Sequence, residues 1–344
     1  MQRKSAQVEM NEKLSLVVTS IASPNPVLRA LAEGARGRGH QFIVIGDVPS
    51  PQDFHLEGCD FYNLEAQYET GFRTARLCPT RHYARKNLGY LLAMRAGARV
   101  IFETDDDNIP REEFWGERVR RKSVPVVKGD GWVNVYRYFT DANIWPRGLP
   151  LDEVRRPVPD IASLEVTDAD CPIQQGLADE NPDVDAIYRL VETLPQSFGR
   201  DASVALGAGA WGPFNSHNTT WWRDAFMLLY LPAYCSFRMT DIWRSFVAQR
   251  IAWEQGWSVL FHGPTVWQER NEHNLMRDFK DEVPGYLHNS AIADALSGLK
   301  LKPGASNVAD ALRACYSKLV EMSLVDEREL ELLDAWAEDV GSVL

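Results

Sequence analysis

Two short apolar runs, separated by a segment of helical pattern, constrain the fold of this chain more than any other feature. The runs LSLVVTSI (14–21) and QFIVI (41–45) are β-branched and bounded by turn residues, as buried strands are. Residues 27–36 lie between them and predict a helix, which stops at Gly37 and Gly39. A strand, a helix and a second strand in this order are the opening of an α/β fold.

The pattern continues further along the chain. Residues 83–97 predict a helix that leads directly into an apolar strand over residues 99–104. Residues 241–255 predict another helix, which is followed by a strand over residues 258–262. The sequence therefore predicts an α/β chain well beyond its first two strands.

Two stretches depart from this pattern. Residues 147–183 are rich in proline and acidic residues and show little periodicity, so we expect a long surface excursion there, such as a lid or an acceptor-binding insertion. Regular structure is expected to resume over residues 184–191. Residues 305–344 have helical spacing and acidic faces without a strand signal. We expect a main domain over residues 1–290 and a small helical C-terminal appendage over residues 291–344.

The composition limits the kinds of partner. At 45% hydrophobic and 25% charged residues, the chain resembles ordinary soluble globular proteins. Its formal net charge of -11 argues against a nucleic-acid partner, which requires a clustered basic surface. No run approaches the ~18 consecutive apolar residues of a membrane span, and residues 1–13 lack the apolar segment of a signal peptide. We expect a soluble, cytoplasmic protein, and we leave open whether it forms a homo-oligomer.

The sharpest local signal is the acidic triplet Asp105-Asp106-Asp107, which directly follows the strand over residues 99–104. Ligands collect at the carboxyl ends of strands in open α/β sheets. Three adjacent carboxylates repel one another, and their hard oxygens suit Mg²⁺ or Mn²⁺, which in turn bind phosphate oxygens. Such an ion could neutralise a departing diphosphate. The alternative is a solvated acidic loop that caps the next helix.

Several basic and polar residues precede the triplet. Arg81, Arg85, Lys86 and Asn87 cluster at the start of the helix over residues 83–97, where they could hold a diphosphate with help from the helix dipole. The alternative is an ordinary charged helix face. Asp47, after the second strand, could bind a base or a ribose, or it could be a turn residue.

Sugars stack on aromatic faces, and residues 131–150 are dense in aromatic side chains. The candidates are Trp132, Tyr136, Tyr138 and Trp145, although most are expected to be core residues. Arg147 lies between Pro146 and Gly148, in a backbone context that suits an aimed side chain.

Polar residues follow in two further segments. Asn215 and His217 lie in residues 214–222, after a glycine-rich stretch that permits close ligand approach, or else they form a capped turn. Asp241, beside Trp243, could act as the base that takes a proton from an acceptor hydroxyl. It could equally be the N-cap of its helix, a role that Thr240 could also fill.

Taken in order, five segments resemble a known family. They are RVIFETDDDNIP, NVYRYFTDANIWPRGLPLD, DVDAIYRL, FNSHNTTWW and MTDIWRSFVAQR. Together they resemble the STELLO-like glycosyltransferases and are more distantly similar to the reversibly glycosylated polypeptides, the UDP-arabinopyranose mutases. The resemblance covers residues 14–274, and its ordered string is more specific than any one segment.

The resemblance implies a GT-A-like nucleotide-diphospho-sugar transferase fold, with a Rossmann-like mixed sheet flanked by helices. It implies a DXD-type site for Mn²⁺ or Mg²⁺ at the acidic triplet. Arg147 matches the reversibly glycosylated arginine of the mutases, and Asp241 matches an acceptor-binding carboxylate. The mutase pattern has a histidine where this chain has Gln268. The third metal ligand is therefore expected to be His273, or else His262.

We expect a metal-dependent glycosyltransferase with a UDP-sugar donor and an unidentified acceptor, which could be a glycan, a lipid or a small molecule. The alternatives are a pyranose/furanose mutase acting through Arg147, and a non-catalytic nucleotide-sugar-binding scaffold for polysaccharide synthesis. Arg147 and Asp241 are the expected catalytic residues, and Asp105, Asp107 and His273 the expected metal ligands. The expected substrate-binding residues are Asp47, Arg81, Arg85, Lys86, Asn87, Asp105, Asp106, Trp145, Asn215, His217 and Trp243.

Overall fold

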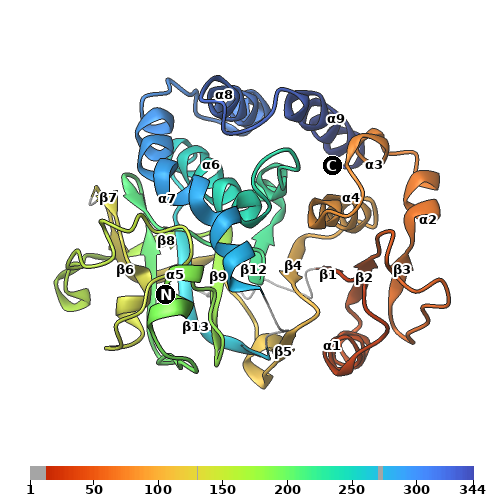
Figure 1. Cartoon of the computed structure of the whole chain (residues 1–344), viewed down its shortest axis with the longest axis horizontal. Helices are drawn as coiled ribbons and strands as arrows, with labels where there is room; N and C mark the ends of the chain where they lie inside the picture. Colours follow the sequence, from red (N-terminus) through yellow and green to blue (C-terminus); the bar gives the residue numbers. More distant parts are fainter. Residues whose placement is uncertain (1–12, 130, 270–273) are drawn as a thin grey trace, which may run out of the picture.

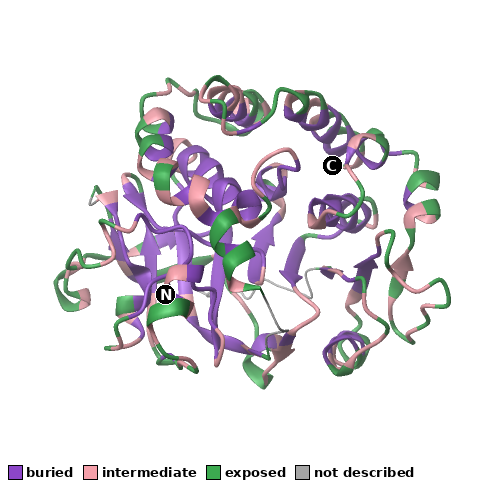
Figure 2. Ribbon diagram, viewed as in Figure 1, coloured by how far each residue is buried: buried purple, intermediate pink, exposed green. Residues whose placement is uncertain are grey.

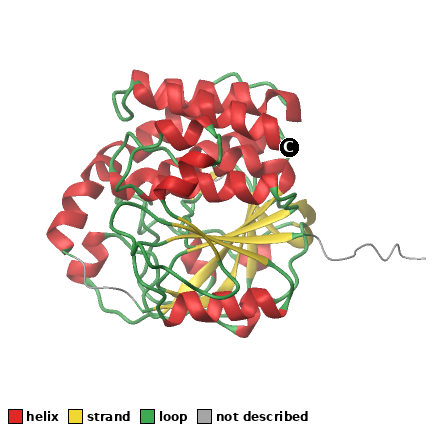
Figure 3. Ribbon diagram, turned by 90° about the vertical axis from the view of Figure 1, so that its right-hand side faces the viewer, coloured by secondary structure: helices red, strands yellow, loops and turns green. Residues whose placement is uncertain are grey.

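The computed structural model describes residues 13–129, 131–269 and 274–344. One large mixed sheet crosses the molecule, with helices stacked in layers on one face and helix α1 (Pro26–Gly37) on the other (Figures 1 and 3). The strand order in this sheet is β3-β2-β1-β4-β12-β9-β13-β10-β6-β8, and β5 pairs with β13. A separate small sheet pairs β7 with β11.

The first half of the sheet is parallel. It consists of β3 (Asp60–Tyr62), β2 (Gln41–Ile45), β1 (Leu14–Thr19) and β4 (Val100–Thr104). The connection from β1 to β2 is helix α1 (Pro26–Gly37), as the alternating sequence pattern predicts. The carboxyl ends of these strands therefore meet at one edge of the sheet.

The second half is mixed. Its strands are β5 (Asn108–Pro110), β6 (Arg121–Val127), β8 (Val166–Asp170), β9 (Ile173–Asp179), β10 (Ser203–Leu206), β12 (Asn218–Trp222) and β13 (Val259–Gln268). Strand β12 runs antiparallel to both β4 and β9, and β9 is parallel to β13. Strands β9 and β13 therefore point the same way as β1 and β4, and their carboxyl ends lie at the same edge.

Alternate residues of the strands face two different cores. On one face, Leu16 and Val18 of β1 pack with α1. On the other, Val17 packs with α4 (Lys86–Arg95), in a core that also includes residues of α6 (Thr240–Glu254). Helix α4 lies so close to β1 that a Cβ at Gly89 would come within 2.4 Å of a methyl carbon of Val17. This close packing fixes the start of α4 beside the carboxyl edge of the sheet.

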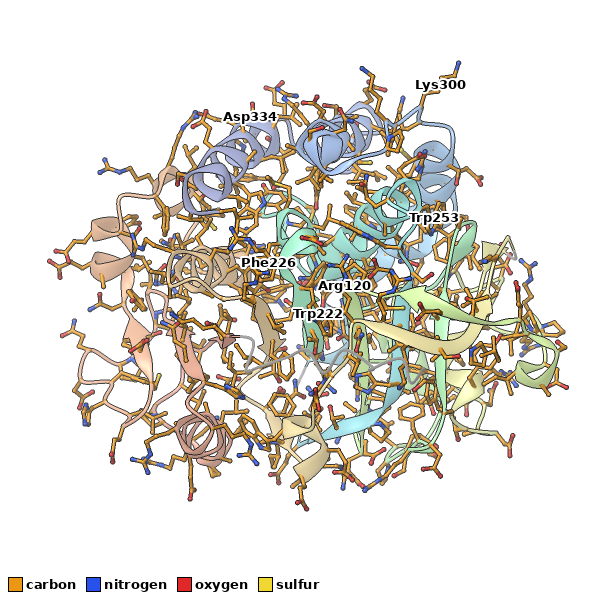
Figure 4. The ribbon with its side chains drawn as sticks, turned by 180° about the vertical axis from the view of Figure 1, so that it is seen from behind. Arg120, Trp222, Phe226, Trp253, Lys300 and Asp334 are labelled. Atoms are coloured by element: carbon orange, nitrogen blue, oxygen red, sulfur yellow. The ribbon has the colours of Figure 1, made fainter. Side chains whose placement is uncertain are left out.

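An outer helical layer covers α4 and α6. It is formed by α7 (Leu275–Ser297), α8 (Val308–Glu321) and α9 (Arg328–Val343). These helices bury their inner faces and expose their outer ones (Figure 2). Seen from behind, Lys300 and Asp334 lie on this outer layer, whereas Trp222 of β12 lies near the middle of the molecule (Figure 4).

Shorter elements complete the fold. The remaining helices and strands are α2 (Leu64–Glu69), α3 (Arg73–Leu77), α5 (Ala186–Val191), β7 (Gly131–Trp132) and β11 (Ala210–Trp211). The 3₁₀ helices are η1 (Tyr83–Arg85), η2 (Glu112–Trp115), η3 (Val135–Tyr138), η4 (Ile161–Ser163), η5 (Arg223–Leu229), η6 (Phe237–Met239) and η7 (Ala305–Asn307).

The predicted α/β fold class is confirmed: the chain has a Rossmann-like mixed sheet flanked by helices, with helices at its C-terminus. The division at residue 290 stays a prediction, and α7 continues through it. None of the helices in the described ranges has the length and apolar character needed to cross a membrane. The predicted cytoplasmic location stays a prediction.

Two local predictions are wrong. Residues 147–183 are not simply a surface excursion, because they contain β9, a central strand that is buried along its whole length. Neither Thr240 nor Asp241 is the N-cap of α6, because the helix starts one residue earlier than expected. Its N-cap is Met239, which makes no side-chain capping hydrogen bond.

Candidate active site

A polar pocket of about 240 Å³ opens at the carboxyl edge of the sheet. Segments far apart in the sequence meet there: the turn after β4, the loop before α5, the start of β12 and the first turn of α6. The residues lining it are Thr19, Tyr83, Asp105, Asp106, Asp107, Arg147, Asp183, Arg189, Ser216, His217, Phe237, Arg238, Asp241 and Gln268.

The acidic triplet forms one wall of the pocket, and each of its carboxylates is held by a polar neighbour. Asp105 Oδ1 accepts a hydrogen bond from the buried Lys86 Nζ at 2.6 Å. Asp106 Oδ2 accepts from the hydroxyl of Ser20, and Asp107 Oδ2 accepts from Gln268 Nε2 at 2.9 Å. The turn that carries the three side chains is therefore fixed from β1, α4 and β13.

The acidity of Asp106 is altered by its surroundings. Burial, together with the negative charges of Asp105 and Asp107, raises the pKa of Asp106 to about 6, and the hydrogen bond from Ser20 opposes the shift. Burial and the neighbouring carboxylates thus both disfavour the charged form of Asp106, and a bound cation would offset this.

The opposite wall is a buried ion cluster around Arg147. Its Nε and Nη2 donate to the two carboxylate oxygens of Asp183 at 2.8 and 2.9 Å. Its Nη1 and Nη2 donate to the two oxygens of Asp241, each at 3.1 Å. Nη1 also donates to the carbonyl of Arg238. All three guanidinium nitrogens are therefore engaged.

The cluster fixes the charges of its members. Burial alone would lower the pKa of Arg147, but the charges of Asp183 and Asp241 outweigh burial and raise it well above its usual value. Burial alone would raise the pKa values of both aspartates, yet the charge of Arg147 holds them below their usual range. Both carboxylates are consequently ionised at neutral pH.

His217 lies between the two walls. Its Nε2 is 3.4 Å from Asp105 Oδ2. Its Nδ1 is buried and has no hydrogen-bond partner among the described residues. His217, Asp183 and Asp241 each offer a ligand atom, and these atoms all lie within 4.8 Å of one another.

Two places in the pocket could therefore be considered for a divalent ion. The group of Asp183, His217 and Asp241 has the right atoms, but Arg147 already supplies a cation to both of its carboxylates. Asp105 and Asp107 provide two hard oxygen donors on a turn that opens to the pocket. Lys86 pairs with one oxygen of Asp105, whereas Arg147 contacts both oxygens of each carboxylate in the other group. Mg²⁺ is commonly held by one or two carboxylates together with substrate phosphates. The acidic triplet fits such an ion better.

Sequence comparisons identify relatives of the chain. A family model described as STELLO glycosyltransferases matches residues 238–343. Two proteins of Arabidopsis thaliana, the probable glycosyltransferases STELLO2 and STELLO1, are 32% and 33% identical to it over 286 and 270 residues. These alignments cover 77% and 73% of the chain. The chain belongs to the STELLO-like glycosyltransferase family.

This STELLO-like chain spans little more than a third of its curated relatives, because the alignments cover 37% of STELLO2 and 35% of STELLO1. Among solved structures, a mycobacterial protein aligns with a TM-score of 0.41 and 11% identity, over 81% of this chain and 75% of the other. Glucosyl-3-phosphoglycerate synthase of M. tuberculosis aligns with a TM-score of 0.41 and 9% identity, over 81% of each chain.

The predicted basic cluster does not gather in the pocket of the STELLO-like chain. Arg85 turns inward and donates to Gln67 and to the carbonyls of residues 75 and 78. Asn87 pairs with the backbone of Leu231 in both directions. Lys86 contacts Asp105 from behind, and Arg81 is exposed outside the pocket lining.

Other predicted substrate residues are also engaged elsewhere. Asp47 accepts from the backbone nitrogens of Val48 and His82, so it acts as a turn residue in this structure. Trp145 is buried against Asp185, and Trp243 against Asn289.

Asn215 lies just behind the pocket, where its Nδ2 donates to Asp183. His262 lies outside the pocket lining, and His273 lies outside the described residues.

The aromatic candidates behave in the same way. Trp132, Tyr136 and Trp145 are buried core residues. The rings that do line the pocket are Tyr83 and Phe237, whose centroids lie 4.9 Å apart.

Several pocket residues were not among the predicted site residues. Asp183 gave no local signal, since it lies in the proline-rich stretch that we expected to be irregular. Its one trace was the segment DVDAIYRL, which begins at this residue and contributed to the family resemblance. Gln268 was noted as a departure from the mutase pattern, and in the structure it positions Asp107.

Proposed function

We propose that this chain is a metal-dependent glycosyltransferase that uses a nucleotide-diphospho-sugar donor, most simply a UDP-sugar. The observation that carries the proposal is the acidic turn of Asp105–Asp107, which lines a pocket at the carboxyl edge of the sheet. Family membership supports sugar transfer as the chemistry, and the resemblance supports UDP as the nucleotide.

The metal-binding role falls to Asp105 and Asp107. Bound there, Mn²⁺ or Mg²⁺ would supply positive charge to a departing diphosphate. The surrounding residues fix the positions of these ligands: Lys86 holds Asp105 by a partly buried ion pair, and Gln268 donates a hydrogen bond to Asp107. His273 stays a predicted third ligand.

Asp241 is better suited to orienting an acceptor than to deprotonating it. The charge of Arg147 holds the pKa of Asp241 below its usual value, although burial opposes this. A carboxylate with a lowered pKa is a weak general base, because the effective base has a pKa near the working pH. Tyr83 and the backbone of Ser216 also donate to Asp241 and fix its position. We therefore assign it a positioning role.

The same cluster argues for transfer over ring interconversion. A mutase of the reversibly glycosylated kind requires Arg147 to act as a nucleophile toward the sugar. Here its side chain is only 2% exposed, and all three of its guanidinium nitrogens donate to oxygens. Its raised pKa also removes the neutral form that could attack. The buried ion cluster therefore favours transfer to a separate acceptor.

Binding of UDP, measured by isothermal titration calorimetry with and without Mn²⁺, tests the metal site. We expect Mn²⁺-dependent binding by the unaltered chain and a loss of roughly 10-fold or more in Asp107→Asn, by analogy with the cost of disturbing metal-site residues. Asp53→Asn removes a charge from an exposed loop and serves as the matched control. Unchanged affinity in Asp107→Asn would contradict the metal assignment.

A second experiment distinguishes sugar transfer from interconversion of the pyranose and furanose forms. UDP-arabinopyranose is incubated with the protein and Mn²⁺ in the absence of an acceptor, and the ring form of the sugar is followed by NMR. We expect the pyranose to persist. Accumulation of the furanose form, together with radiolabel retained on the protein and lost in Arg147→Lys, would establish the mutase instead.

A further inference from the structure

A second and larger pocket, of about 510 Å³, lies on the other face of the sheet. Adjacent residues of β9 show the relation of the two sites, since neighbouring side chains of a strand point to opposite faces. Gln175 borders the space beside Arg147 and Asp183, whereas Gln174 lines the second pocket. The second pocket is therefore separated from the acidic turn by the sheet itself.

The lining of the second pocket is positive, although the chain as a whole is acidic. Four of its side chains are cationic, and two are acidic, which gives the lining a net charge of +2 in a chain of net charge -11. The cationic residues are Arg118, Arg121, Lys122 and Arg200, and the acidic ones are Glu113 and Glu117. A local positive field in a concave site concentrates anions.

Two of the four cations have no carboxylate partner among the described residues. Arg200 pairs with Glu113 at 2.7 Å, and Arg121 pairs with Asp168 at 3.2 Å. Arg118 and Lys122 form no such pair within the described ranges, and the Nζ of Lys122 donates to the hydroxyl of Ser203 at 3.2 Å. Their two charges have no ion-pair partner within the described ranges, and the lining carries one further acidic side chain, Glu117.

Arg118 is held firmly in place. Its guanidinium carbon lies 4.3 Å from the centroid of the Phe102 ring, and its Nη1 donates to the carbonyls of Phe114 and Gly116 at 2.8 and 3.1 Å. Burial lowers the pKa of Arg118 to about 10, so it remains a cation at neutral pH. A fixed guanidinium loses little entropy when it binds an oxyanion.

His262 completes the floor of this pocket as a neutral group. Burial lowers the pKa of His262 to about 3, and the positive charges of Arg118 and Lys122 add to the effect. The pocket thus offers a metal ion a neutral imidazole beside two uncompensated cations. This combination repels a metal and suits an anion.

We propose that this second pocket binds a small multivalent oxyanion, a molecule bearing phosphate or carboxylate groups, independently of any divalent metal. Its volume falls within the ~300–1,000 Å³ of small-molecule sites. Arginine and lysine bind both classes of oxyanion through charge-assisted hydrogen bonds. The proposal does not depend on the glycosyltransferase assignment, because none of the residues of the acidic turn takes part.

Thermal unfolding in the presence of EDTA tests the proposal, with inorganic phosphate in one arm and citrate in the other, at constant ionic strength. A ligand that binds only the folded state raises the melting temperature in a saturable way. We expect such a rise for at least one anion in the unaltered chain, and a loss of roughly 10-fold in apparent affinity in Lys122→Gln, one tenfold step being ~1.4 kcal/mol.

Lys128→Gln is the matched control, because this exposed lysine follows the same strand, β6, and lies outside the pocket lining. Arg118→Lys keeps the charge and removes the planar fork, so it should weaken the response without abolishing it. The proposal is overturned if neither anion produces a saturable rise, or if Lys122→Gln responds like Lys128→Gln. It is also overturned if Asp107→Asn abolishes the response, since the anion would then lie in the first pocket.

Discussion

The pKa values of buried carboxyl groups are shifted in opposite directions in the pocket and in the outer helical layer. At the pocket, Asp183 and Asp241 share the cation Arg147, and their pKa values are lowered. In the helical layer, Glu329 of α9 is completely buried but forms no ion pair within the described ranges, and burial raises its pKa to about 7. The charge of the partner, rather than the depth of burial, decides the ionisation state.

The partners of Glu329 show what the second arrangement does. Its carboxylate accepts hydrogen bonds from the hydroxyl of Tyr230 and from the backbone nitrogens of Ala233 and Tyr234. It therefore fastens the loop after η5 to helix α9 without requiring a charge. In the pocket, Asp183 and Asp241 stay negatively charged beside the cation Arg147, as expected of a ligand-binding site. In the helical layer, the carboxyl group of Glu329 has a structural role, because its hydrogen bonds connect the loop after η5 to α9.

The largest change in unfolding free energy is expected from removing Arg147, the counter-ion of the pocket. Arg147→Met would leave Asp183 and Asp241 buried with no cation between them, and breaking a buried ion pair in this way costs ~3–5 kcal/mol of unfolding free energy. Urea unfolding at pH 7 measures the loss.

Neutralising the stranded charges should reverse part of that loss. The triple variant Arg147→Met with Asp183→Asn and Asp241→Asn is expected to be more stable than Arg147→Met alone. If the single variant loses less than ~1 kcal/mol, which is the range of surface pairs, the cluster does not carry the electrostatic role assigned to it.

Glu329 is expected to have a smaller effect on the unfolding free energy, and its pH dependence is opposite to that of Asp183. Its raised pKa means that the folded state binds more protons than the unfolded state between about pH 4.3, the usual glutamate value, and pH 7. The stabilising contribution of Glu329 is therefore present below pH 4.3 and is lost as the pH rises through 7, by at most ~4 kcal/mol. The lowered pKa of Asp183 has the reverse consequence, since its contribution is present above about pH 4 and is lost on acidification.

The variant Glu329→Gln isolates this contribution. We expect the free energy of unfolding of Glu329→Gln to change less between pH 5 and pH 7.5 than that of the unaltered chain. Chemical denaturation at the two pH values provides the comparison, and parallel pH profiles for the two proteins would refute the assignment.

The smallest effect is expected for an exposed ion pair. Arg36 and Glu57 form a contact in which the side chains are 54% and 81% exposed. Because solvent screens such pairs, Arg36→Ala should change the unfolding free energy by less than ~1 kcal/mol. A loss as large as that of Arg147→Met would show that pairing itself, and not burial, governs the difference between the two regions.

The sequence revealed the parts of the fold that local patterning controls. The apolar runs of β1, β2 and β4 and the helices between them follow directly from periodicity. Strand β9 was hidden because it contains Gln174 and Gln175. Both are buried, and each side-chain amide donates to one nearby carbonyl and to one carbonyl from a distant segment. Such long-range partners satisfy polar groups in a way that a local pattern cannot reveal.

The candidate site divides in the same way. The acidic triplet was predictable because its three carboxylates follow their strand directly. The partnership of Arg147 with Asp183 and Asp241 was not predictable from spacing, since the three residues come from distant segments. Arg85 and Asn87 looked like ligands at a helix start, but tertiary contacts turn them toward backbone groups.

The central claim is that a divalent ion and a nucleotide diphosphate meet at Asp105 and Asp107. Anomalous diffraction from Mn²⁺ in crystals soaked with UDP tests this claim most directly, because it locates the ion without assuming any activity. We predict a peak in contact with the carboxylates of Asp105 and Asp107, adjacent to the diphosphate. A peak among Asp183, His217 and Asp241, or no peak in the pocket, would contradict it.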